Sequence, residues 1–258
     1  MNKIVKIIIG IVVVIALAIG AVFYFTAGME DTADSFFKAI KNQDIAAARG
    51  YLSEDFKAST DEASLKEFLS KGALLNFNKA SWSNRQISGG RGELNGEVIT
   101  ESGGAVPLKL LFVKENDKWK IYSIQKPTAG LQTVQASPTV PAKTDQITLV
   151  KRSMHDFAVS VNNKSMAHFR STTSQLWQKQ FTIEKFEEAF GKVYKFGLDF
   201  TILDGYEPII EPVSALGENG ELILKGYFPT KPNKVDFEQK YIYEGVDWKL
   251  YGFKFNIT

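Results

Sequence analysis

Two copies of one segment decide the fold: Glu115-Asn116-Asp117-Lys118-Trp119-Lys120-Ile121-Tyr122 and Glu244-Gly245-Val246-Asp247-Trp248-Lys249-Leu250-Tyr251. In each, a glutamate precedes a short polar connection, and a strand-like Trp-Lys-[Ile/Leu]-Tyr run follows. In the first copy, Glu115-Asn116-Asp117 joins Val106–Lys114 to Lys118–Gln125 and has the residue types of a hairpin turn. The segment therefore predicts a closing β-hairpin that occurs twice in the chain.

Matching residues extend from this hairpin toward the start of each copy. Asn95-Gly96-Glu97-Val98-Ile99 falls on Asn219-Gly220-Glu221-Leu222-Ile223. More distant matches pair Phe36 with Phe157, Ile40 with Val161, Arg49 with Arg170, Phe56 with Trp177 and Glu67 with Glu188. The spacing between partners only grows along the chain, which short loop insertions in the second copy explain. An ordered series with matching chemistry predicts an internal duplication.

Each copy shows helix patterns first and strand patterns afterwards. Apolar spacing predicts helices over Asp31 to Arg49 and Asp61–Lys71, the second with a Thr60/Asp61 cap signal, and then strands over Ala80–Ser88, Gly92–Thr100, Val106–Lys114 and Lys118–Gln125. The second copy predicts helices over Gln146–Asn162 and Thr182–Tyr194, and strands over Leu198–Glu211, Glu221–Phe228, Val235–Tyr243 and Trp248–Ile257. This order indicates an α+β fold in which each domain has a four-stranded antiparallel meander.

The opening helix Phe36–Arg49 and the closing Glu-x-x-x-Trp-Lys-[Ile/Leu]-Tyr hairpin resemble the nuclear transport factor two-like superfamily, also called cystatin-like. The resemblance implies helices packed into a curved sheet to form a cone. The arrangement is also similar to bacterial envelope proteins that carry such a domain behind a membrane anchor. This superfamily contains enzymes, binding proteins and structural modules, so the resemblance implies a fold and leaves the function open.

An uncharged apolar run extends from Ile7 to Met29. As a helix it is long enough to cross the ~30 Å hydrocarbon core of a bilayer. A cleaved signal peptide is the alternative, with Thr26-Ala27-Gly28 as its weak cleavage site. Lys3 and Lys6 precede the run and acidic residues follow it, so we expect the N-terminus inside and the bulk outside the bacterial inner (cytoplasmic) membrane, in the periplasm or the extracellular space.

The expected organisation has five parts. Residues 1–6 form a cytoplasmic tail, 7–29 one transmembrane helix, 30–127 the first repeat, 128–145 a linker rich in Pro and Thr, and 146–258 the second repeat. Lys3 and Lys6 account for the formal net charge of +2, so the rest of the chain is neutral and gives no reason to expect nucleic-acid binding. The chain has no cysteine, which excludes disulfides, thiolate metal sites and a lipoprotein anchor.

No motif in the sequence predicts a catalytic residue, a cofactor or a metal ion. His155 and His168 do not share a helix face, and Gly89-Gly90-Arg91-Gly92 precedes a strand rather than the helix that a phosphate loop requires. We therefore expect a non-enzymatic binding or scaffold module of the cell envelope. The alternative is a small-molecule-binding or hydrolytic cone pocket that uses acidic and tyrosine side chains, with Tyr206, Glu207, Glu211, Tyr227 and Tyr241 as candidates.

The last strand of the second copy predicts an interface. Strict alternation places Lys249, Tyr251, Phe253, Phe255 and Ile257 on one face of the sheet, and Trp248, Leu250 and Gly252 on the other. Helices cover only one face, so a second apolar face needs another partner. We expect pairing through the sheets within the chain or in a homodimer, or binding of a protein or envelope component. The candidate interface residues are Trp248, Leu250, Tyr251, Phe253, Phe255, Tyr122 and Ile124.

Overall fold

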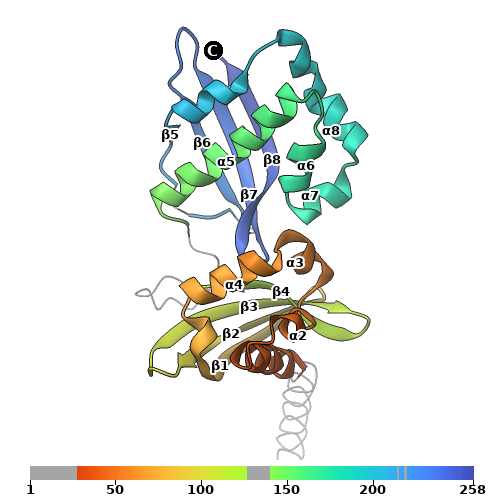
Figure 1. Cartoon of the computed structure of the whole chain (residues 1–258), viewed down its shortest axis with the longest axis vertical. Coiled ribbons are helices and arrows are strands. Elements are labelled where there is room, and N and C mark those ends of the chain that lie inside the picture. The colour runs from red at the N-terminus through yellow and green to blue at the C-terminus, as the bar shows by residue number, and fades with distance from the viewer. Residues whose placement is uncertain (1–27, 127–139, 214, 218–219) are drawn as a thin grey trace, which may run out of the picture. The chain divides into compact units, whose positions relative to one another are not determined.

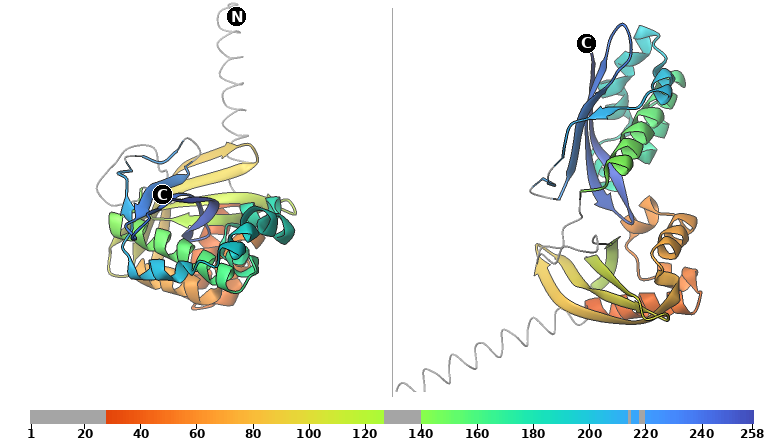
Figure 2. Two further views of the ribbon diagram at one scale, coloured as in Figure 1. Left: turned by 90° about the horizontal axis from the view of Figure 1, so that it is seen from above. Right: turned by 90° about the vertical axis from the view of Figure 1, so that its left-hand side faces the viewer.

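The computed structural model describes residues 28–126, 140–213, 215–217 and 220–258, and it divides the chain into two compact units between Ala129 and Gly130. Each unit is α+β, with an antiparallel four-stranded sheet whose strands follow one another in sequence order (Figure 1). In each unit the helices lie on one face of the sheet (Figure 2). The expected tail and nearly all of the expected membrane span lie outside the described residues. None of the described helices is both long and apolar enough to cross a membrane.

In unit 1, helices precede a meander joined by tight turns. The elements are a first helix over residues 28–41, α2 (Ile45–Arg49), α3 (Glu54–Ser59), α4 (Glu62–Lys71), the 3-10 turn η1 (Leu74–Asn76), β1 (Phe77–Ser88), β2 (Arg91–Thr100), β3 (Ala105–Glu115) and β4 (Lys118–Gln125). The hairpin turn at Asn116 and Asp117 is confirmed, and both residues have positive φ (49° and 61°), as a type I′ turn requires. Asp61 caps α4 as expected, by accepting from the Ser64 N–H at 2.7 Å.

The expected continuous helix from Asp31 to Arg49 is wrong, because the chain turns at residues 42–44. Gln43 adopts a left-handed φ of 58°, which an α-helix does not accommodate. The Asp44 carboxylate then accepts from the Ala47 N–H at 2.8 Å and starts α2 as a new helix. The turn therefore separates the first helix from α2.

In unit 2 the helical part is longer. Its elements are α5 (Lys143–Asn162), α6 (Ala167–Thr172), α7 (Gln175–Gln180), α8 (Ile183–Phe190), the 3-10 helices η2 (Gly191–Phe196) and η3 (Phe200–Gly205), β5 (Ile209–Ile210), β6 (Leu222–Phe228), β7 (Val235–Glu244) and β8 (Asp247–Ile257). The strand expected over Leu198–Glu211 is wrong except for Ile209–Ile210. The Asp199 carboxylate accepts from the Thr201 N–H at 3.0 Å and starts η3 instead, which buries Phe200 and Leu203.

A hydrogen bond from the closing hairpin to a helix start occurs in both units. The Glu54 N–H donates to Glu115 Oε1 at 3.0 Å, and the Gln175 N–H donates to Glu244 Oε2 at 2.8 Å. Both donors are first residues of short helices, α3 and α7, where the N–H has no partner within the helix. The glutamate that opens the repeated sequence segment therefore ties the end of the sheet to the helical layer.

Further bonds around this junction repeat in the same way. Ser53 Oγ accepts from the Phe56 N–H, and Ser174 Oγ accepts from the Trp177 N–H, both at 3.1 Å. The Ser53 N–H donates to Ile121 O at 2.9 Å, and the Ser174 N–H donates to Leu250 O at 2.8 Å. Arg49 Nη1 donates to Thr60 O at 3.0 Å, and Arg170 Nε donates to Phe181 O at 2.9 Å. Trp119 and Trp248 both lie in the last strand of their sheet. The expected equivalence of the two copies is confirmed at the level of individual hydrogen bonds.

The last strand of each unit contains a β-bulge at the tyrosine of the repeated segment. In unit 1, Leu111 pairs with Ser123 and Phe112 with Ile121, so Tyr122 is the extra residue. In unit 2, the shift between Lys240 and Tyr241 leaves Tyr251 as the extra residue in β8. A bulge reverses the alternation of faces beyond it, so strict alternation over Trp248–Ile257 is wrong. Phe253 and Phe255 face the helices together with Trp248 and Leu250.

This reversal lets β8 contribute its aromatic side chains to one core. Phe157 on α5 lies at the centre of that core, with ring centroids 4.9 Å from Phe253, 5.1 Å from Phe255 and 5.4 Å from Phe169. Further rings of α8 and η3 surround it. Aromatic contacts of this kind stabilise a core beyond the area that they bury.

We expect Glu244→Ala to lower the free energy of unfolding by about 1.5–3 kcal/mol, because Glu244 is fully buried and the Gln175 N–H would lose a charged acceptor. Glu115→Ala is the matched control. It should cost less, under about 1 kcal/mol, because water can reach the exposed Glu54 N–H. Urea denaturation of residues 28–258, followed by tryptophan fluorescence, measures both. Equal losses would contradict a larger role for the buried carboxylate.

Candidate functional site

A polar cluster lies in the interior of unit 2. The Tyr241 hydroxyl lies 3.0 Å from Ser153 Oγ and donates to Gln239 Oε1, and both Tyr241 and Gln239 are fully buried. Burial raises the pKa of the Tyr241 phenol above its ordinary value. The amide Nε2 of Gln239 is buried and has no hydrogen-bond partner among the described residues. Tyr241 is therefore a neutral hydrogen-bonding group inside a closed core.

The other residues of the cone-pocket hypothesis do not converge on Tyr241. Tyr227 pairs with Asp236 on the opposite face of the sheet, whereas Tyr241 faces the helices. Glu207 and Glu211 are exposed, and Tyr206 packs against the edge of the unit 2 core. The structure does not assemble an acidic group and a tyrosine from this set into one pocket.

The two histidines lie at the surface. His155 Nδ1 is 2.8 Å from the Asp204 carboxylate, and His168 Nε2 is 3.2 Å from that of Asp156. Both imidazoles are exposed. No group of three or more metal-ligating side chains is present in the described part of the chain.

The seven predicted interface residues fall into two groups. Five contribute to the core side of the sheet in their own unit: Trp248, Leu250, Phe253, Phe255 and Ile124. Tyr122 and Tyr251 are half-exposed bulge residues. The sequence pattern suggested two apolar faces because the bulge could not be seen in it.

The outer face of the unit 2 sheet is charged instead of apolar. Glu238 lies 3.4 Å from Lys225 and 3.6 Å from Lys240, and Lys254 pairs with Glu238 across the strands. Partial burial raises the pKa of the Glu238 carboxyl, but the hydrogen bond and charge of Lys225, with the charges of Lys254 and Lys240, outweigh it, so the pKa lies below its usual value. This face suits a polar partner.

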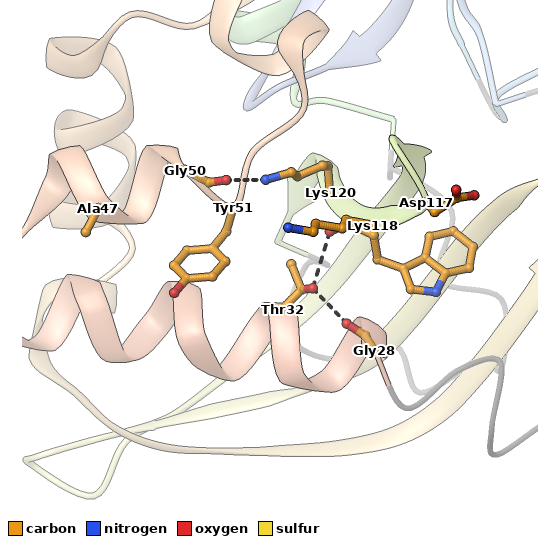
Figure 3. Close-up of a pocket in the computed structure, with 9 residues that line it drawn as sticks. Gly28, Thr32, Ala47, Gly50, Tyr51, Asp117, Lys118 and Lys120 are labelled. Carbon is orange, nitrogen blue, oxygen red and sulfur yellow. Dashed lines mark hydrogen bonds between the residues drawn. The ribbon is translucent and has the colours of Figure 1, made fainter.

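Unit 1 has an open groove beside the closing hairpin (Figure 3). Its volume is about 580 Å³, and its lining comes from the first helix, α2 and the following loop, and the β3–β4 hairpin. The lining residues are Gly28, Thr32, Ala47, Gly50, Tyr51, Asp117, Lys118, Trp119 and Lys120. The groove therefore includes the Trp-Lys part of the segment that decides the fold.

The polar groups of the groove are held in place by local bonds. The Thr32 hydroxyl donates to Gly28 O at 2.7 Å and lies 3.3 Å from Trp119 O. Lys120 Nζ donates to the carbonyl oxygen of Gly50. Figure 3 shows the Lys118 and Lys120 side chains reaching toward Gly50 and Thr32, while the Asp117 carboxylate points the other way. Two ammonium groups on one side of the groove favour an anionic ligand.

The start of the first helix is fitted closely into unit 1. Met29 is fully buried, and a Cβ added at Gly92 would lie 2.1 Å from its sulfur atom. A Cβ at Gly28 would lie 3.2 Å from Trp119 Cδ1. Met29 was expected to end the membrane span, but it packs in the core of unit 1. Gly92 leaves the space that its side chain fills.

Unit 2 has a second groove, of about 510 Å³, between α7 and α8. Its walls are aromatic, with Trp177, Phe181, Phe186 and Phe190, and Lys185, Lys192 and Glu188 lie at its rim. The residue equivalent to Ala189 in unit 1 is the larger Phe68. The two copies therefore differ in side-chain size at a position that lines this groove.

Sequence reasoning missed both grooves. The unit 1 groove forms where segments distant in the chain meet, and the unit 2 groove forms between the consecutive helices α7 and α8, so periodicity within one helix or strand carries no sign of either. The available signal was the difference between aligned positions, such as Phe68 against Ala189. A second signal was the pair of lysines that flank Trp119 in the repeated segment.

We expect Tyr241→Phe alone to destabilise unit 2 by about 1–3 kcal/mol, because the buried Gln239 amide loses its donor. The double variant Tyr241→Phe with Gln239→Leu should recover to within about 1 kcal/mol of the original chain, because replacing both partners with apolar groups removes the unpaired amide as well. At the positions equivalent to Tyr241 and Gln239, unit 1 has Phe112 and Leu110, and both are buried. Chemical denaturation measures the series. A double variant less stable than the single one would contradict the argument.

We expect Gly92→Ala to cost about 1–3 kcal/mol, because its Cβ would displace the Met29 side chain. In a Met29→Ala background the same change should cost much less, since the displaced atoms are gone. A double-mutant cycle by urea denaturation measures this coupling. Additive effects would show that Met29 and Gly92 do not share this space.

Comparisons of the chain with family models, with curated proteins and with solved structures give no match.

Proposed function

We propose that this chain is a single-pass membrane protein whose two α+β domains form a non-enzymatic binding or scaffold module outside the bacterial inner membrane. One observation carries the proposal. Met29, at the end of the uncharged run, is buried in unit 1, and residue 28 is already helical. Ile7 to Ala27 remains long enough as a helix to cross the ~30 Å hydrocarbon core. The proposed anchor therefore leads into the first domain with no linker between them.

The distribution of charge supports the orientation. Lys3 and Lys6 precede the apolar run, whereas Glu30, Asp31 and Asp34 follow it. Basic flanking residues remain on the cytoplasmic side. The absence of cysteine agrees with a bacterial envelope domain built without disulfides.

The surfaces of the described residues support binding more than catalysis. Unit 1 offers the lysine-containing groove, and unit 2 offers an aromatic groove and a charged sheet face. The partner in this proposal is a protein or an envelope component, and pairing through the sheets remains one way to engage it. A nuclear transport factor two-like relationship belongs to the same proposal. Helices on one face of a curved four-stranded sheet support it (Figure 2).

One observation favours the alternative of a small-molecule-binding or hydrolytic cone. The unpaired amide of Gln239, beside the Tyr241 hydroxyl, is a buried donor that a polar ligand could satisfy. The aromatic packing around Phe157 weighs against space for such a ligand. We therefore give this alternative second place.

The full chain, produced in a bacterial host, should resist extraction from membranes by alkaline carbonate, and its trypsin-sensitive bulk should be accessible only from outside. The variant Val13→Arg with Leu17→Arg should be released, because each arginine near the centre of a span costs about 2.5–3.5 kcal/mol. The retained protein should keep its original N-terminus. A mature N-terminus near Gly28, or release of the unmodified chain, would contradict the anchor.

A further inference from the structure

We propose that the unit 1 groove binds the phosphate group of an anionic phospholipid in the outer leaflet of the membrane that the N-terminal segment crosses. The inference rests on the proposed membrane anchor. It concerns the groove lined by Thr32, Tyr51, Lys118, Trp119 and Lys120.

Covalent connection places the groove at the depth of the lipid headgroups. Gly28 lines the groove and directly follows the apolar run that ends at Ala27. The headgroup region extends about 5–7 Å beyond the hydrocarbon core on each side of a bilayer. Thr32 lies one helical turn after Gly28, or about 6 Å at ~1.5 Å per residue. An anchored chain thus holds the groove where headgroup phosphates are concentrated.

The chemistry of the groove fits a phosphate group. An ammonium group has three donors, and Lys120 uses one of them for the Gly50 carbonyl, so it retains capacity for an anion. Lys118 is exposed and reaches the same side (Figure 3). Tyr51 and Trp119 are residue types enriched at membrane interfaces, where an apolar ring and a polar edge are both accommodated.

Two of the three acidic side chains near the start of the first helix, Glu30 and Asp34, are engaged elsewhere, and the third, Asp31, is exposed. The Glu30 carboxylate forms an ion pair with Arg85, and Asp34 accepts from Trp82 Nε1 at 2.9 Å. Both partners lie on β1, away from the closing hairpin. These contacts reduce the repulsion that an incoming phosphate would meet.

The connection to the membrane favours a lipid over a soluble anion. A lipid headgroup is present at the groove at a high local concentration for as long as the chain is anchored, whereas a free anion binds only at its bulk concentration. Each basic residue near an anionic membrane surface raises the affinity for that surface roughly fivefold. Two lysines are therefore enough to select an anionic lipid from the surrounding bilayer.

The test is lysine acylation of the full chain, read by mass spectrometry, in nanodiscs of phosphatidylcholine alone and in nanodiscs with phosphatidylglycerol added. We expect Lys118 and Lys120 to react about fivefold more slowly in the anionic nanodiscs. Lys66 on α4 is exposed and should react at the same rate in both. Equal rates for all three lysines in the two nanodiscs would overturn the inference.

A second experiment distinguishes a lipid phosphate from a free phosphate ion. Inorganic phosphate added to the full chain in uncharged detergent should not protect the two lysines, and equal protection would assign the groove to a soluble anion instead.

By native mass spectrometry, Lys118→Gln with Lys120→Gln should lose preferential retention of phosphatidylglycerol. The control Lys66→Gln with Lys71→Gln should keep it, and retention by both variants would also overturn the inference. Carbonate extraction of the same samples shows whether the anchor holds, so failure of the anchor and failure of lipid binding remain distinct.

Discussion

The β-bulge at Tyr122 and Tyr251 is the constraint on which the rest of each unit depends. It inserts one residue opposite Phe112 or Tyr241 and so reverses which face of the sheet the following side chains occupy. Residues on both sides of the bulge then face the helices, so a single strand contributes to the core along its whole length. The same strand carries the hairpin whose glutamate accepts a bond from the start of α3 or α7. Without the bulge, Phe253 would face away from Phe157 and the core would lose that contact.

The two copies keep this framework and differ in what surrounds it. Capping serines, the bridging arginine and the hairpin glutamate repeat with nearly equal distances. Interior and surface positions have changed, with Leu110 and Phe112 replaced by Gln239 and Tyr241, and Phe68 by Ala189. Several of these bonds are buried, as at Ser53 and Glu244, and changing one partner of a buried bond leaves a buried donor or acceptor unpaired. Groove-lining positions such as Ala189 lie outside this set of bonds and can differ between the copies.

Much of the architecture could be predicted from the sequence, because the closing segment and the helix pattern are local signals. The duplication, the antiparallel meander and the turn at Asn116 and Asp117 follow from such signals. The errors arose where one residue overrides a pattern. Gln43 breaks an apparently continuous helix, Asp199 starts a 3-10 helix within an apparent strand, and Tyr251 reverses the faces of β8. The groove could not be predicted, because segments distant in the sequence form it.

The packing of Met29 against Gly92 determines how the proposed anchor would act on the first domain. A flexible linker of n residues lets its ends separate by about 5–6 Å × √n, so even ten residues would let a groove move through more than the thickness of a headgroup layer. Here Gly28, which follows Ala27, lines the groove, and Met29 is buried in the core of unit 1. A side chain at Gly92 would remove the space that Met29 occupies. The missing side chain at Gly92 thus lets the chain enter the domain directly, and in the proposed anchored protein this would fix the depth of the groove lysines relative to the membrane.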